Sequence, residues 1–142
     1  MYETGVPGGN TGLPASGAFT SASNSLVNFQ LASYTANNVL TLGYNEPTTG
    51  TLTLATPSTF SSLNLLDSAV NGNAPFAFTL HFGDGSSTTV NNNVAPDWFF
   101  NSPYALSGFD RVGRTTGEFE GDVGNPRFYE LDYRLSPADQ VK

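Results

Sequence analysis

The sequence predicts an all-β protein, a two-sheet antiparallel β-sandwich, from three observations. Apolar and polar residues alternate with a period of two, turn residues recur between the alternating runs, and helical spacing of apolar residues does not persist over a convincing length. With 142 residues, the chain is expected to form one domain over 1–142 with a real hydrophobic core. Long loops gathered toward one end favour a jelly roll over an immunoglobulin topology.

The first half of the chain carries most of the short alternating runs. Residues 1–25 are rich in Gly, Ser, Thr and Pro and are expected to form either a linker-like stretch or an edge segment. The apolar anchors of an edge segment would be Tyr2, Val6, Leu13 and Phe19. Leucine alternating with threonine suits a pleated, half-buried surface. We therefore expect short strands in the following runs: 27–31, 40–42, 51–55 and 63–65.

The second half contains the strongest local signal. The run 76–82 is predicted to be a strand because every second side chain is large and apolar: Phe76, Phe78, Leu80 and Phe82. Gly83-Asp84-Gly85 then supplies the positive backbone dihedrals of a tight hairpin, and 86–90 runs back antiparallel. After an irregular stretch, 128–135 forms a final strand. The residues that follow, 136–139, form a turn or a short helical start.

Charge is distributed unevenly along the chain. Residues 1–83 hold three acids and no base, whereas 84–142 hold nine acids and all five bases, and the net charge is -7. Sequence-independent nucleic-acid binding is not expected, because neutralising phosphates requires clustered Lys and Arg. The first part is therefore expected to be scaffold, and any functional site is expected in the charged part.

Composition bears on compartment and cofactors. The chain has no cysteine, which excludes disulfides and Cys-ligated metal sites. Few charges and many Ser, Thr and Asn residues indicate a secreted, extracellular or cell-surface protein. The beginning of the chain lacks the pattern of a signal peptide, so an exported form would be a mature or excised piece. Because no apolar run reaches the length of a membrane span, membrane insertion is not expected.

Several short sequence motifs then suggest a family. They are 16–21 (SGAFTS), 80–86 (LHFGDGS), 95–99 (APDWF), 109–117 (FDRVGRTTG) and 125–130 (NPRFYE). The chain resembles a recurrent domain of exported bacterial proteins, often found with PEP-CTERM-type sorting tails. The resemblance implies a galactose-binding-like jelly roll in a surface or matrix protein. Such domains usually continue past the phrase at 138–140 into another strand, so the resemblance implies a C-terminal strand that is missing or supplied by another chain, and a sheet edge open to self-association.

The sequence offers little support for an enzyme. Glu130 and Asp132 resemble the start of the catalytic strand of laminarinase-type glycoside hydrolases, but the third carboxylate of that strand is absent. Glu118 and Glu120 lie in a glycine-flanked loop that offers little burial to separate their pKa values. His81 has no nucleophile motif nearby. The sequence therefore predicts a protein that is not an enzyme, with a hydrolase as a remote alternative.

Calcium is the one cofactor that the sequence leaves open. Oxygen ligands are frequent in the loops, although their spacing matches no EF-hand or calcium repeat. The alternative is that these side chains stabilise turns. The residues concerned are Asp84, Asp97, Asp110, Asp122 and the run 91–93.

The loop region 97–127 is the predicted ligand site. Aromatic faces and planar polar groups are concentrated there, and sugar recognition needs both. The candidate residues are Trp98, Tyr104, Asp110, Arg111, Arg114 and Arg127. The opposing interpretation is that Trp98 and Phe99 plug one end of the sandwich. Arg111 and Arg127 would then hold the loop through ion pairs with Asp97, Asp110 or Glu130.

Two functions remain open from sequence alone. The first is a non-catalytic module that binds carbohydrate, such as an exopolysaccharide or another matrix polymer. The second is a structural or adhesive module that contacts other proteins or copies of itself.

Overall fold

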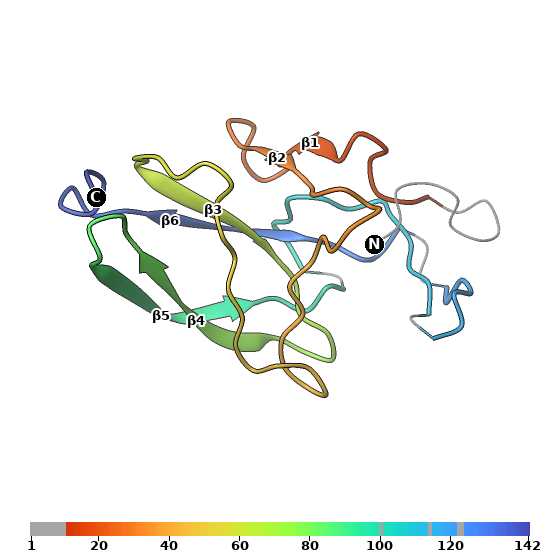
Figure 1. Ribbon diagram of the computed structural model, residues 1–142. Coiled ribbons are helices and arrows are strands. Elements are labelled where there is room, and N and C mark those ends of the chain that lie inside the picture. The colour runs from red at the N-terminus through yellow and green to blue at the C-terminus, as the bar shows by residue number, and fades with distance from the viewer. Residues whose placement is uncertain (1–10, 100, 114, 122–123) are drawn as a thin grey trace.

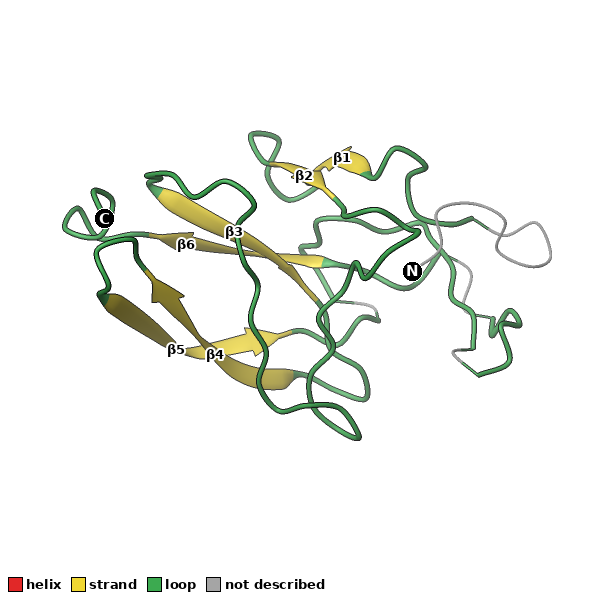
Figure 2. Ribbon diagram, viewed as in Figure 1, coloured by secondary structure: helices red, strands yellow, loops and turns green. Residues whose placement is uncertain are grey.

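The computed structural model describes residues 11–99, 101–113, 115–121 and 124–142. Over these residues the protein is all-β without a helix, as predicted. The strands pair as three two-stranded antiparallel sheets, an arrangement consistent with a β-sandwich (Figures 1 and 2). The strands are β1 (Ala18–Thr20), β2 (Asn28–Gln30), β3 (Ser62–Asp67), β4 (Ala74–His81), β5 (Ser87–Ala95) and β6 (Tyr129–Arg134).

The β3–β6 and β4–β5 pairs form the body of the molecule (Figure 2). In the β3–β6 ladder, Leu63 lies opposite Tyr133 and Leu65 opposite Leu131, so these four side chains share one face. The Tyr133 ring meets the Phe78 ring of β4 edge to face, with 5.6 Å between centroids. This face of β3–β6 therefore packs toward β4–β5.

The β4–β5 hairpin confirms the clearest sequence prediction. Phe76, Phe78 and Leu80 are half-buried, whereas the intervening residues are exposed. Gly85 adopts a φ of 86°, and the Phe82 amide donates a 3.0 Å hydrogen bond to the Ser86 carbonyl. The turn closes where the sequence placed it because only glycine adopts such a φ without steric cost.

β5 continues beyond the predicted strand 86–90, through the asparagine run to Ala95. The register shifts in this run, since Phe76 pairs with Asn93 but Phe78 pairs with Val90. Asn92 has a φ of 62°, a conformation that asparagine tolerates better than most residues. A β-bulge thus allows β4 and β5 to stay paired through residues 91–95, which were expected to be irregular.

β1 lies within the segment 1–25, expected to be a linker or an edge, and β2 lies within the strand predicted at 27–31. Two of the four anchors expected in 1–25 lie outside the described residues. The rings of Phe19 and Phe29 face each other across the ladder at 5.4 Å, and Leu13 is buried. Gly17, just before β1, has a φ of 71° and packs so closely that a Cβ would lie 2.8 Å from Nε2 of Gln30. Residues 11–25 are therefore laid against the body rather than detached from it.

The strands predicted at 40–42 and 51–55 are wrong. Neither run forms a strand, and all of these residues are exposed. The turn between them is compact, because the Gly43 amide donates to the Pro47 carbonyl and the Glu46 amide to the Gly43 carbonyl. Period-two patterning makes a segment competent for a sheet, but a strand also requires a partner edge within hydrogen-bonding distance.

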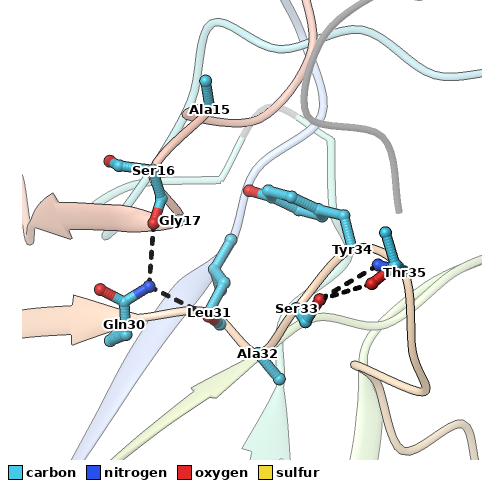
Figure 3. Close-up of a pocket in the computed structure, with 9 residues that line it drawn as sticks. All are labelled: Ala15, Ser16, Gly17, Gln30, Leu31, Ala32, Ser33, Tyr34 and Thr35. Carbon is cyan, nitrogen blue, oxygen red and sulfur yellow. Dashed lines mark hydrogen bonds between the residues drawn. The ribbon is translucent and has the colours of Figure 1, made fainter.

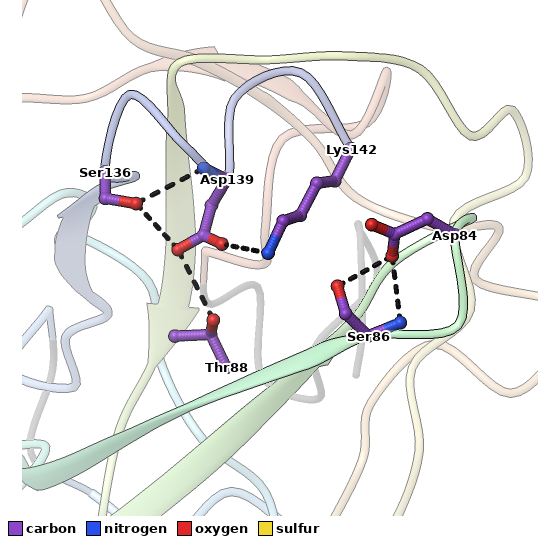
Figure 4. A network of polar contacts seen from close by, with 6 residues as sticks. All are labelled: Asp84, Ser86, Thr88, Ser136, Asp139 and Lys142. Carbon is purple, nitrogen blue, oxygen red and sulfur yellow. Dashed lines mark hydrogen bonds and ion pairs between the residues drawn. The ribbon is translucent and has the colours of Figure 1, made fainter.

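The residues after β6 form the predicted turn, which fastens the end of the described chain to β5. Asp139 accepts hydrogen bonds from the hydroxyls of Ser136 (2.8 Å) and Thr88 (3.3 Å). It also pairs with Lys142 at 3.0 Å (Figure 4). These contacts, the bond with Lys142 first, hold the pKa of Asp139 below its usual value.

Candidate functional site

The loops converge at one end of the sandwich. β3 and β5 end there, and β4 and β6 begin there, so the connections 68–73 and 96–128 leave the two sheets at the same end. Backbone hydrogen bonds tie them together: the Ala69 amide donates to the Pro96 carbonyl (2.8 Å), and the Trp98 amide donates to the Ala69 carbonyl (2.9 Å). The region that the sequence singled out thus lies over the open end of the core.

Asp97 organises this end through its side chain and its amide. The carboxylate accepts hydrogen bonds from the backbone amides of Gly72 (2.5 Å) and Phe99 (2.9 Å). Its own amide donates to Oδ1 of Asn73 at 2.8 Å. A carboxylate that accepts backbone N–H groups on either side fixes the path of both connections.

The Asp97 carbonyl receives two further donors. One is the hydroxyl of Tyr129, the first residue of β6, at 2.8 Å. The other is Nδ2 of Asn101 at 2.9 Å. The loop at 97–101 is thereby attached to the beginning of β6.

These connections enclose a hollow of about 340 Å³ at the end of the sandwich. That volume is at the small end of the range for ligand sites. Its wall combines carboxyl, amide and hydroxyl groups with apolar surface. The lining residues are Asp67, Asn73, Val94, Pro96, Asn101, Ser102, Pro103, Tyr129, Glu130 and Leu131.

Asp67 is the most perturbed group in the hollow. It closes β3 opposite Tyr129, on the face that packs toward β4–β5. Its Oδ1 atom is buried without a hydrogen-bond partner among the described residues. Burial raises the pKa of this carboxyl from 3.8 to about 6. Perturbed carboxyls gather at functional sites more often than elsewhere.

Arg111 and Trp98, two of the predicted site residues, lie together in the loop. The Arg111 guanidinium is 5.3 Å from the centre of the Trp98 ring and 5.0 Å from that of Phe99. Trp98 and Phe99 also stack, with centroids 5.0 Å apart. Arg111 Nε lies 3.7 Å from a carboxylate oxygen of Glu120. These contacts brace the loop, although Glu120 is not one of the partners that the packing interpretation named. Neither Trp98 nor Arg111 lines the hollow.

Arg127 and Tyr104 lie nearer to the hollow. The Arg127 guanidinium stands 4.8 Å from the centre of the Tyr104 ring, and its Nη1 donates to the Asn101 carbonyl at 2.7 Å. Asn101 lines the hollow, so this pair supports its rim. Arg114, the remaining predicted arginine, lies outside the described residues.

Asp110 is buried and serves the loop itself. Its two carboxylate oxygens accept hydrogen bonds from the amides of Thr11 (2.7 Å) and Gly124 (2.6 Å). The neighbouring ring of Phe109 stacks on Phe128 at 4.9 Å. Asp110 therefore joins the beginning of the described chain to the loop and leaves little of its carboxylate for a ligand.

The described carboxylates that the sequence offered as calcium ligands also accept hydrogen bonds from the loops and turns. Oδ1 of Asp84 accepts the amide (2.8 Å) and the hydroxyl (2.6 Å) of Ser86, which lowers the pKa of Asp84. Asp97 and Asp110 bind backbone amides, and Asp122 lies outside the described residues. No group of three or more His, Cys, Asp or Glu side chains in the described part of the chain could hold a metal ion.

The candidate catalytic groups are dispersed. Glu130 is held by Ser23 (3.4 Å) and Asn24 (3.5 Å), whereas Asp132 is exposed. His81 is exposed at the end of β4. Glu118 and Glu120 are exposed as well.

Sequence reasoning missed the polar groups of the hollow. Asp67 could have been found from the alternation of β3, because it continues the face of Leu63 and Leu65. A side chain at that position is expected to point toward the core. Asn73 and Asn101 had none, since loop asparagines are also common turn residues.

A second hollow, of about 280 Å³, lies beside β1 and β2 (Figure 3). Its wall includes Gln30, Ser33 and Tyr34 and carries no Asp, Glu, Lys, Arg or His. The Tyr34 hydroxyl donates to the Pro14 carbonyl at 2.8 Å. This hollow is uncharged and lies away from the loop region predicted to bind a ligand.

Comparison of the chain with protein families, with curated proteins and with solved structures finds no match. Among the described residues, no helix is long and apolar enough to cross a membrane. The geometry of the loop end is therefore the basis of the functional proposal.

Proposed function

We propose that this protein is a non-catalytic carbohydrate-binding module, and that the hollow at the loop end is its sugar site. The observation that carries the proposal is the composition of that wall. Asp67, Asn73 and Asn101 provide planar polar groups, and Pro96 and Pro103 provide apolar surface. A pyranose presents hydroxyl groups at its rim and C–H groups on its faces, so it needs this mixture.

The frame around the hollow supports the same proposal. Sugar sites gain affinity when their polar groups are held in place before the ligand arrives. Asn73 and Asn101 are both hydrogen bonded to the backbone of Asp97, and Tyr129 anchors that backbone from β6. The amides are therefore positioned by the protein rather than by the ligand.

The charge of the wall narrows the ligand class. Asp67 and Glu130 line the hollow, and none of its lining residues is a Lys, Arg or His. A polymer of uronic acids would place its carboxylates beside these acids and be repelled. Neutral polysaccharides are the preferred ligands.

The proposed setting is a jelly-roll domain of an exported bacterial surface or matrix protein. A low content of charged residues, at 12%, and an abundance of Ser, Thr and Asn support this setting. The resemblance to exported bacterial domains supports it as well. In such a protein the module would hold the chain to an extracellular polymer.

Affinity gel electrophoresis tests the proposal. The folded protein is run through gels that contain a neutral galactan, a neutral β-glucan or polygalacturonate. We expect retardation in a neutral gel and none in polygalacturonate. Asn101→Ala should abolish the retardation, whereas Asn91→Ala, at an exposed position of β5 outside the hollow, should not.

Asn101 is a sharper probe than Trp98, because Asn101 lines the hollow and Trp98 does not. Circular dichroism of each variant confirms that it is folded. Equal migration of the wild-type protein in all gels, with and without polymer, would refute sugar binding. Retardation that Asn101→Ala leaves unchanged would place the site elsewhere.

A further inference from the structure

The segment 39–54 presents an apolar surface to solvent. Leu52 is 72% exposed and Leu54 is 52% exposed. Contiguous apolar patches on soluble proteins mark interaction sites. Of the ten large apolar side chains exposed in the described residues, six belong to this segment: Val39, Leu40, Leu42, Tyr44, Leu52 and Leu54.

The segment has two legs joined by the compact turn at 43–47, and the legs differ. The leg 40–42 contacts the rest of the segment, since Cδ1 of Leu40 lies 2.6 Å from where a Cβ on Gly50 would stand. All five residues of the leg 51–55 are exposed, and they form no backbone–backbone hydrogen bond with the described residues. Figure 1 shows it as a loop without a strand arrow. Its β-competent pattern is therefore unused within the described fold.

We propose that residues 51–55 pair antiparallel with the same residues of a second copy of the chain. The sequence Thr-Leu-Thr-Leu-Ala is nearly palindromic about Thr53. In the two-fold register centred there, Thr53 lies opposite Thr53 of the second copy, and Leu52 lies opposite Leu54. The leucines of both copies then gather on one face of the ribbon, where cross-strand apolar pairs stabilise it.

Charge favours a second copy over other occupants. Each copy carries a net charge of -7, and the stretch 47–66 contains no charged residue, so two copies can meet there without like charges opposite one another. An anionic membrane is a poorer match, because residues 1–83 contain no Lys or Arg to attract it.

The size of the surface sets the expected strength. Stable interfaces use about 20–30 residues on each side. The segment 39–54 is shorter than that, so we expect a weak dimer with a Kd of roughly micromolar or above.

Sedimentation equilibrium over a concentration series tests the dimer. We expect reversible dimerisation that the double variant Leu52→Glu, Leu54→Glu abolishes, because it places four carboxylates in the ribbon. Leu26→Glu is the matched control, since Leu26 is 89% exposed and lies outside the segment. Thermal melts should be unchanged in these variants, because the altered side chains are exposed.

Cysteine cross-linking tests the register. The chain contains no cysteine, so a single introduced thiol reports only on itself. Directly opposite residues of an antiparallel pair are about 4.5–5.5 Å apart at Cα, within disulfide range. Thr53→Cys should therefore oxidise to a covalent dimer, whereas Thr51→Cys, with about 13 Å between its copies, should not.

Three outcomes would overturn the proposal. They are a monomer at every concentration with no cross-linking of Thr53→Cys, a dimer that survives the double glutamate variant, and equal cross-linking at positions 51 and 53. Vesicle binding by a protein that stays monomeric would assign the surface to lipid instead. None of these results bears on sugar binding, because the proposed sugar site is lined by other residues and is tested by a separate assay.

Discussion

The hydroxyl of Tyr129 donates a 2.8 Å hydrogen bond to the carbonyl of Asp97. This single contact joins the first residue of β6 to the residue that holds both connections at the open end of the sandwich. Tyr129 is 3% exposed, so the bond forms where water competes little. The hollow that we propose as the sugar site therefore depends on a strand residue, Tyr129, whose hydroxyl is bonded to the backbone of the loop.

Tyr129→Phe should destabilise the protein by about 1 kcal/mol, the usual net value of a buried hydrogen bond. The ring and its packing are retained, and the Asp97 carbonyl keeps Asn101 as a donor. Urea denaturation of the wild type and variant measures the difference in unfolding free energy. Tyr44→Phe is the control, because Tyr44 is 95% exposed, and an equal loss in both variants would contradict the role of the bond.

Asp67→Asn should change the pH dependence of stability. Burial raises the folded-state pKa of Asp67 from 3.8 to about 6, so the folded protein binds more protons than the unfolded chain between these values. The stability associated with this carboxyl is fully present below pH 3.8 and is lost as the pH rises through 6. At neutral pH the variant should be more stable by on the order of 1 kcal/mol, reduced by solvent screening.

Thermal or urea denaturation at several pH values between 3 and 8 measures this effect. The quantity compared is the unfolding free energy of the wild type minus that of the variant. Asp132→Asn, on the exposed side of β6, is the matched control. A difference for Asp67→Asn that does not vary with pH would mean that the carboxyl titrates normally.

Asp110→Ala should cost about 3 kcal/mol, because two backbone donors lose a charged acceptor. Hydrogen exchange should also accelerate at the amides of Thr11 and Gly124. Asp132→Ala removes an exposed carboxyl and should stay within about 0.5 kcal/mol of the wild type. Unchanged exchange at both amides would show that Asp110 does not hold them.

Gly17→Ala should destabilise more than Gly117→Ala, although the two glycines have nearly the same φ, 71° and 68°. The strain of a positive φ is common to both, at about 1–2 kcal/mol. Only at Gly17 does the new Cβ clash, at 2.8 Å from Gln30 Nε2 and 3.1 Å from the Leu31 carbonyl. We expect a further penalty of about 1–2 kcal/mol there by urea denaturation, and equal losses would contradict the contact.

None of the predicted ligand-binding residues in the described part of the chain lines the hollow that we propose as the site. The glycine- and proline-punctuated stretch 97–127 does gather at one end of the molecule. Arg111 and Asp110, however, hold that stretch together, while Asp67 and Asn73, distant in sequence, line the hollow. Sequence adjacency does not reveal which side chain a distant backbone amide will engage, because that depends on how the loops cross.

The all-β class, the β4–β5 hairpin and the final strand β6 follow from the sequence, because alternation and glycine-dependent turns act over a few residues. The tertiary structure alone decided which competent segments became strands. Residues 51–55 have as regular an alternation as 63–65, yet only the latter meets a partner strand. A ladder requires the backbone groups of two segments, and the position of the second is set by the whole chain.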